Sequence, residues 1–161
     1  MTAPTPAPTW EEFAAALKTA LGKLGDGMVL VISSKTRPWV VAEFAQGRDL
    51  LYAEVSGELL GDEDVTRVDS PETRRILESH GWQPPDEAKG YMWHRLVPYP
   101  PTSAEYRAIA EGAVANLRDV NGLASPAELG YRAWEGLNNN EFWEVNLPGV
   151  EAQPLRGRRP S

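Results

Sequence analysis

The chain has 161 residues, 42% of them hydrophobic and 24% charged, which are the proportions of one ordinary globular domain with enough apolar surface for a core. Its net charge of −7 argues against non-specific binding to nucleic acid or to anionic membranes, since both depend on clustered Lys and Arg. The lack of cysteine excludes disulfides, thiolate catalysis and Cys-ligated zinc.

Nothing in the sequence predicts a targeting or membrane-spanning segment. No apolar run approaches the ~20 residues that cross a bilayer. The first nine residues, MTAPTPAPT, have neither the basic residues nor the apolar stretch of a signal peptide. Together with the lack of cysteine, which suits a reducing compartment, these features predict a soluble cytoplasmic protein.

A Pro-rich leader precedes the first predicted helix. Residues 1–8 alternate Pro with Ala and Thr and have little to bury, so we expect an extended, flexible segment. Thr9 and Glu12 have the spacing of a capping box, which predicts that a helix begins after Thr9. Gly25 is expected to end this helix. Its apolar residues recur at helical spacing: Trp10, Phe13, Leu17, Leu21 and Leu24.

Three strands are predicted after this helix, arranged as an antiparallel meander. Residues 28–32 form a short, unbroken apolar run, which is typical of a strand buried on both faces. Residues 39–45 and 50–55 alternate between two faces, and the sequence Gln-Gly-Arg-Asp at residues 46–49 is typical of a hairpin turn between them.

Two further helices, separated by a strand, are predicted in the second half. The sequence Ser-Pro-Glu at residues 70–72 marks a helix start, and Gly81 marks its end. Residues 91–97 have the composition of a strand. A second capping box, Thr102 with Glu105, begins the third helix.

The sequence therefore predicts an α+β fold, an antiparallel sheet with three helices in the order α-β-β-β-α-β-α. Residues 129–134 fit either a last strand or an extended arm. We expect a flexible leader at residues 1–8, a single domain at residues 9–136 and a C-terminal tail at residues 137–161.

No group of residues has the spacing of a catalytic or metal site. The two histidines, His80 and His94, lack further ligands at zinc spacing, so we interpret them as a helix-end residue and a strand residue. The acidic run at residues 62–64 lacks the alternate spacing of a calcium loop. No serine lies in a nucleophile elbow. The prediction is a protein that is not an enzyme and has no catalytic residue, metal or cofactor.

The six tryptophans are the strongest indication of a contact surface. Trp and Tyr anchor many protein interfaces, although they also fill cores. Trp39 and Trp93 share strand faces with charged residues, so for these two the core and the contact surface are equally good interpretations. The candidate partner-binding residues are Trp39, Val41, Tyr52, Trp93, Trp134 and Trp143.

Several motifs carry a family resemblance: WEEF at residues 10–13, VVAEFA at 40–45, LYAEVS at 51–56, GWQPP at 81–85 and LRDVNG at 117–122. Over about residues 9–134 the chain resembles the type III secretion chaperone-like and YbjN-like superfamily, most nearly the actinobacterial domains called TY-Chap. Such sequences carry Asn before the aromatic of the fourth strand, where this chain has Gly90 before Tyr91. The resemblance implies a non-enzymatic, often dimeric module that holds a partner polypeptide, and it brings no catalytic residue with it.

The leading interpretation is a chaperone-like module in which a polypeptide segment docks on apolar grooves beside the sheet and an acidic rim favours a basic partner. A homodimer fits a sheet whose helices lie mostly on one side, because one face is left to cover. One alternative is a small-molecule-binding or catalytic domain with a cavity between sheet and helices, lined by Tyr52, His94 and Tyr106. Another is a structural subunit that uses Phe142, Trp143 and the tail as a docking peptide.

Overall fold

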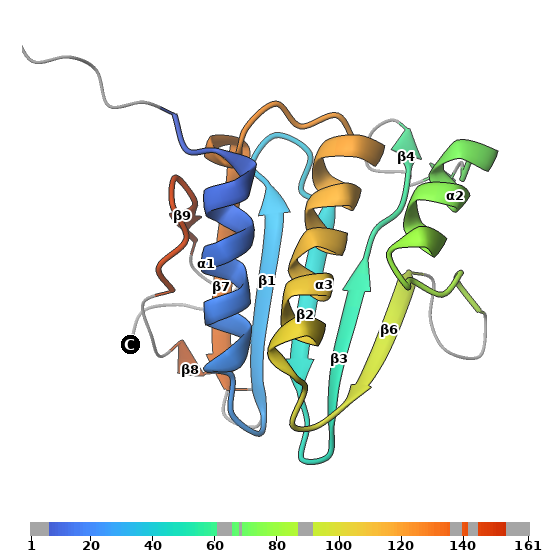
Figure 1. The fold of residues 1–161 in the computed structure, drawn as a ribbon. Coiled ribbons are helices and arrows are strands. Elements are labelled where there is room, and N and C mark those ends of the chain that lie inside the picture. The colour runs from blue at the N-terminus through green and yellow to red at the C-terminus, as the bar shows by residue number, and fades with distance from the viewer. Residues whose placement is uncertain are drawn as a thin grey trace, which may run out of the picture.

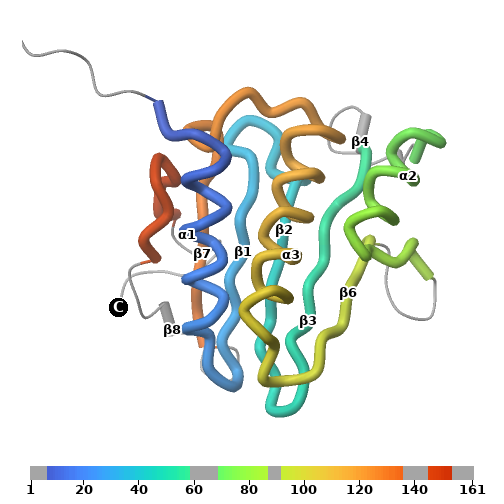
Figure 2. The backbone as a smooth tube through the Cα atoms, in the orientation of Figure 1, coloured from blue at the N-terminus to red at the C-terminus, as the bar shows by residue number. Residues whose placement is uncertain are grey.

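In a computed structural model of the chain, two long helices lie side by side across one face of an antiparallel sheet (Figures 1 and 2). The structure describes residues 7–60, 66–67, 69–86, 92–135, 140–141 and 145–153. The helices are α1 (Trp10–Gly22), α2 (Pro71–Ser79) and α3 (Ser103–Val114), and a π-helical segment, Ala115–Val120, continues α3.

The main sheet has the strand order β6-β3-β2-β1-β7-β8 with every neighbouring pair antiparallel, and β9 pairs parallel to β7. Its strands are β1 (Met28–Ser34), β2 (Val41–Gln46), β3 (Leu50–Val55), β6 (Trp93–Pro98), β7 (Leu129–Glu135), β8 (Asn140–Glu141) and β9 (Glu151–Ala152). A separate two-stranded ribbon is formed by β4 (Leu59–Leu60) and β5 (Thr66–Arg67).

This architecture confirms the predicted α+β fold, and the predicted order α-β-β-β-α-β-α is roughly matched: β4 and β5 are added before α2, and β7, β8 and β9 follow α3. Residues 129–134, which the sequence left as a strand or an arm, form β7, and β7 pairs with β1 along its whole length. The predicted strand at residues 91–97 is found as Trp93–Pro98, and residue 91 lies outside the described residues. Within the described part of the chain, no helix is long and apolar enough to cross a membrane.

Both predicted capping boxes are present. The backbone N–H of Glu12 donates to Thr9 Oγ1 (3.1 Å), and that of Thr9 donates to Glu12 Oε1 (3.3 Å). Thr102 and Glu105 make the same reciprocal pair at 3.1 and 2.9 Å. These bonds satisfy donors that a helix N-terminus otherwise leaves unpaired.

The first helix ends earlier than predicted. α1 stops at Gly22, three residues before the expected stop at Gly25, and Lys23 forms its C-cap with an N–H bond to the carbonyl of Ala20. The left-handed residue of the turn into β1 is Gly27, at φ +85°. Gly25 therefore belongs to the turn rather than to the helix end.

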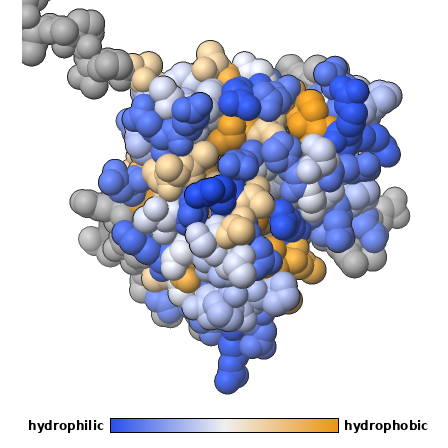
Figure 3. All heavy atoms as spheres, in the orientation of Figure 1, coloured by the Kyte–Doolittle hydropathy of each residue, from blue (hydrophilic) through white to orange (hydrophobic). Residues whose placement is uncertain are grey.

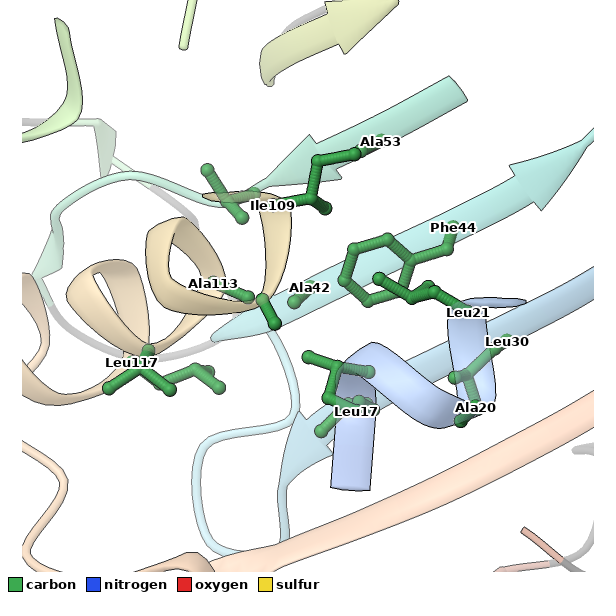
Figure 4. Packing of buried hydrophobic residues seen from close by; sticks show 14 of the residues in the cluster. Leu17, Ala20, Leu21, Leu30, Ala42, Phe44, Ala53, Ile109, Ala113 and Leu117 are labelled. Atoms are coloured by element: carbon green, nitrogen blue, oxygen red, sulfur yellow. The ribbon is translucent and has the colours of Figure 1, made fainter. Parts of the chain in front are cut away.

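The core fills the space between the sheet and the two long helices (Figure 4). Leu17 and Leu21 of α1, together with Ile109 of α3, point toward Ala42 and Phe44 on the sheet, and all five are fully buried. Each large side chain buried in this way contributes roughly 1.5–3 kcal/mol relative to exposure.

Trp82 packs against α3 at a glycine. A Cβ built on Gly112 would lie 2.7 Å from the Nε1 atom of Trp82, closer than any van der Waals contact allows. Trp82 is 2% exposed. The lack of a side chain at Gly112 therefore permits the indole to lie against the helix backbone.

A buried polar network joins the end of β3 to the π-helical segment. The side chain of Asn116 accepts from the backbone N–H of Gly57 (2.9 Å) and donates to Ser56 Oγ (3.3 Å). The amide of Asn121 donates to the carbonyl of Gly57 (2.9 Å). These bonds satisfy backbone groups that lie away from water, so the network fixes the chain where it leaves the sheet.

Part of the segment predicted as a tail packs on the domain. Of residues 137–161, the described residues 145–153 lie against the β7 edge of the sheet. Val145 and Leu147 are buried in the core, and the N–H of Val145 donates to Tyr131 Oη (3.2 Å). The domain therefore continues past the predicted boundary at residue 136.

Candidate functional site

The sheet surface opposite α1 and α3 carries no described helix and is called here the open face (Figure 1). Along each strand, its residues alternate with those that point into the core. From β7 to β6 its members are Arg132 and Trp134; Val29, Val31 and Ser33; Val41, Glu43 and Ala45; Leu50, Tyr52 and Glu54; His94 and Leu96.

One row of the open face is apolar. Cross-strand pairing aligns Trp134, Val29, Ala45, Tyr52 and Leu96 on five successive strands. Leu96 is 48% exposed at the β6 end. Because directly opposed side chains on one face lie about 5 Å apart, these five residues form a continuous strip across the sheet, which we call the apolar row.

The next row carries the charges. The same pairings align Arg132, Val31, Glu43, Glu54 and His94, and we call these five residues the charged row. Val31 and His94 are buried, whereas the three charged residues are partly exposed. Two carboxylates and one guanidinium leave this row with a net negative charge.

The surroundings of Glu43 disfavour its ionised form. Burial raises the pKa of the Glu43 carboxyl, the neighbouring Glu54 raises it further, and Arg132 partly offsets both effects. The hydroxyl of Tyr52 donates a hydrogen bond to Glu54 Oε1, and burial together with this bond raises the pKa of Tyr52. Tyr52 is therefore a neutral donor at physiological pH, and a cation placed between the carboxylates would relieve their repulsion.

The structure brings three of the six candidate partner-binding residues together. Val41, Tyr52 and Trp134 are partly exposed and share the open face. Their neighbours Glu43, Glu54 and Leu96 were not among the candidates, although strand alternation alone places Glu43 with Val41 and Glu54 with Tyr52.

The other three candidates lie elsewhere. Trp93 is completely buried on the helical side of β6, so in this structure it belongs to the core and offers no contact surface. Trp39 precedes β2 and is partly buried against the same core. Trp143 lies outside the described residues, as does Phe142.

The helical side carries a shallow hollow of about 680 Å³ between α1 and α3. Glu11 and Lys18 line it from α1, and Arg107 and Glu111 line it from α3. Figure 3 shows that hydrophilic residues predominate on this side, with hydrophobic ones scattered among them. Because the lining charges are of both signs, the hollow has no strong preference for a charged ligand.

The groups expected to line a catalytic or small-molecule cavity do not converge. Tyr52 and His94 lie on the open face, whereas Tyr106 lies on α3, across the sheet from them. Among the described residues there is no group of three or more His, Asp or Glu that could hold a metal ion.

A family model described as "T3SS (YopN, CesT) and YbjN peptide-binding chaperone 3", or TY-Chap3, matches residues 3–135. No curated protein and no solved structure matches the chain. The matched region runs from the N-terminal leader to the last residue of β7, so it includes both rows of the open face and stops before β8 and β9.

Proposed function

Since the chain belongs to the TY-Chap3 family of peptide-binding chaperones, we propose that it holds a segment of a partner polypeptide on the open face of its sheet, without catalysis. The observation that carries this proposal is the apolar row, a strip of five side chains across a face that no described helix covers. Such a strip beside two carboxylates matches the chemistry of a segment with both apolar and basic residues.

The apolar row supplies the affinity in this proposal. Trp134 and Tyr52 are large, rigid side chains with apolar area and a polar group, the combination that dominates interface hot spots. Leu96 forms the β6 end of the row and is 48% exposed, and Leu50 on the neighbouring strand β3 adds an apolar side chain that is 43% exposed. Burying apolar side chains of a partner against these residues removes water from both surfaces.

The charged row supplies the selectivity. Glu43 and Glu54 lie side by side, and Arg132 balances only one of them. An Arg or Lys of the partner would therefore gain a favourable interaction, whereas an Asp or Glu would meet two like charges. The net charge of −7 attracts basic segments over longer distances as well.

The open face is favoured over the hollow between α1 and α3 as the binding surface. The hollow is lined by charges of both signs, and Arg118 beside it is already paired with Asp119 at 2.8 Å. The open face instead combines a continuous apolar strip with an excess of negative charge.

A homodimer is a second way to cover the open face, and it stays a prediction. Two copies packed through this face would bury Trp134 and Tyr52 of both chains. The molar mass in solution, measured by light scattering at several concentrations, decides whether this face is free to bind a peptide.

The proposal is tested with synthetic 12-residue peptides of equal apolar content, one series carrying Arg and Lys and the other Asp and Glu. We expect the basic series to bind and to shift backbone amide resonances of β1, β2, β3 and β7. Tyr52→Ala and Trp134→Ala should weaken binding, whereas Tyr106→Ala on α3, a partly buried tyrosine across the sheet, is the matched control.

Two results would count against the proposal. Resonance shifts confined to α1 and α3 would move the binding surface to the helical hollow. A saturable thermal stabilisation by a small molecule, with no binding of either peptide series, would favour the ligand-binding alternative.

A further inference from the structure

We infer that the basic C-terminal segment, residues 154–161, docks on the open face of its own chain. The docking itself is independent of the proposed function. Its consequence, competition between this segment and a partner peptide for the open face, rests on that function.

The described chain ends at the sheet edge beside the open face, just after β9. β9 runs parallel to β7, with Glu151 opposite Gly130, and the N–H of Gln153 donates to the carbonyl of Tyr131 (2.8 Å). A Cβ built on Gly130 would lie 2.5–2.8 Å from the side-chain amide of Gln153. Gly130 alternates with the core residue Tyr131, so this amide covers β7 from the open-face side.

β8 and β9 both lie along the outer edge of β7, and β9 ends next to the charged row. β9 points along β7 toward Arg132. The next stretch of that edge is occupied by β8, which pairs with Trp134 and Glu135. Between the described strands β9 and β8, the edge of β7 is left only at Arg132 and Ala133, and Arg132 is the first residue of the charged row.

The sequence that follows complements the charged row. Residues 154–161, PLRGRRPS, contain three arginines and no acidic residue. Arginine binds a carboxylate through two parallel hydrogen bonds. Glu43 and Glu54 bring two negative charges to the charged row, whereas Arg132 brings one positive charge. Leu155 adds an apolar side chain suited to the neighbouring apolar row.

The segment is long enough to reach both carboxylates. Gln153 follows β9, one strand outside β7. With strands about 4.8 Å apart, β2 is roughly 14 Å and β3 roughly 19 Å from β9. An extended chain advances about 3.3 Å per residue, so Arg156 reaches about 10 Å beyond Gln153 and Arg158 about 17 Å. The backbone spans fall a few ångströms short of these distances, and the long arginine side chains cover the difference, so Arg156 can reach Glu43 and Arg158 can reach Glu54.

The test uses the absence of cysteine, which lets a single Ser161→Cys substitution carry a nitroxide spin label. We expect paramagnetic broadening to be strongest at amides of β2 and β3 and weak in α1. The Glu43→Gln/Glu54→Gln pair should remove it, and so should high salt. The matched control, Glu11→Gln/Glu111→Gln on the helical side, should leave it unchanged.

A second measurement uses the full-length variant in which Arg156, Arg158 and Arg159 are replaced by Gln. An added octapeptide with the sequence of residues 154–161 should bind this variant about three- to tenfold more tightly than the unaltered chain, because the open face is no longer occupied in part. Equal affinity for both proteins would overturn the inference.

The outcomes separate this inference from the proposed function. Broadening spread evenly over both sides of the molecule, or unchanged by the two Glu→Gln substitutions, overturns the docking of residues 154–161 even if the 12-residue peptides bind the open face. Broadening on β2 and β3 without binding of any 12-residue peptide supports the docking and contradicts the proposed function alone.

Discussion

Glu43 of β2 and Glu54 of β3 lie directly opposite each other, with both side chains on the open face. Like charges opposed across two strands destabilise a sheet. The pair lies in the charged row, beside the apolar row, so a basic partner removes a repulsion that the free protein carries. This relationship links the stability of the domain to its proposed binding.

Stability should fall as pH rises through the range in which Glu43 ionises. Burial and the neighbouring Glu54 raise the pKa of Glu43 in the folded state above the usual 4.5. At a pH between the pKa of the unfolded state and that of the folded state, the folded state therefore holds the proton more firmly. Glu43→Gln should therefore raise the free energy of unfolding at pH 7 by up to about 1 kcal/mol.

Urea unfolding at pH 7 and pH 4 measures this effect. The gain from Glu43→Gln should shrink at pH 4, where the Glu43 carboxyl of the unaltered protein is protonated and as neutral as the Gln amide. Glu111→Gln on the exposed side of α3 is the control. A gain that is the same at both pH values would show that lost repulsion is not its cause.

Gly112→Ala should destabilise the domain although alanine is the better helix former. The added methyl would lie 2.7 Å from Trp82 Nε1, and overpacking of this kind costs about 1–3 kcal/mol, more than the ~1 kcal/mol gained in helix propensity. Thermal unfolding of Gly112→Ala and of Gly22→Ala, where nothing outside the adjoining backbone and the neighbouring residues lies within 4 Å of the new Cβ, measures the difference. Equal melting temperatures for the two variants would contradict the packing.

Asn116→Ala should cost about 1–3 kcal/mol, because the buried N–H of Gly57 loses its acceptor. Asn116 is completely buried, whereas Asn146 is exposed, so Asn146→Ala is a matched control that should change the free energy of unfolding little. Chemical denaturation of both variants checks this. Faster amide exchange at Ser56 and Gly57 in Asn116→Ala would locate the loss at the end of β3.

The helix starts could be predicted because their signals are local. Thr9 with Glu12, and Thr102 with Glu105, each satisfy donors within three residues, so no distant contact is needed to identify them. The position of β7 beside β1 depends instead on contacts between residues about a hundred positions apart. Nothing in residues 129–134 alone distinguishes a strand from an arm.

Only part of the candidate site could be predicted, because a charged neighbour on a strand does not always mark a face exposed to solvent. Arg95 shares a strand face with Trp93, but its guanidinium donates to the carbonyl of His80 at the end of α2 (3.2 Å), which leaves that face buried. Trp39 lies outside the alternation because β2 begins only at Val41. Where alternation does hold, at Val41 and Tyr52, it identified the open face.

Reversing the charges on the open face should reverse the preference for peptide charge. In Glu43→Lys/Glu54→Lys, Arg132 and two lysines would make the charged row wholly positive, while the apolar row keeps its side chains. Acidic 12-residue peptides should then bind, and basic ones should lose at least tenfold in affinity, as fluorescence anisotropy measures. Lys substitutions at Glu11 and Glu111 add the same charge on the helical side. If Glu11→Lys/Glu111→Lys changes the preference for peptide charge as much as Glu43→Lys/Glu54→Lys does, the net charge of the protein rather than the open face selects the partner.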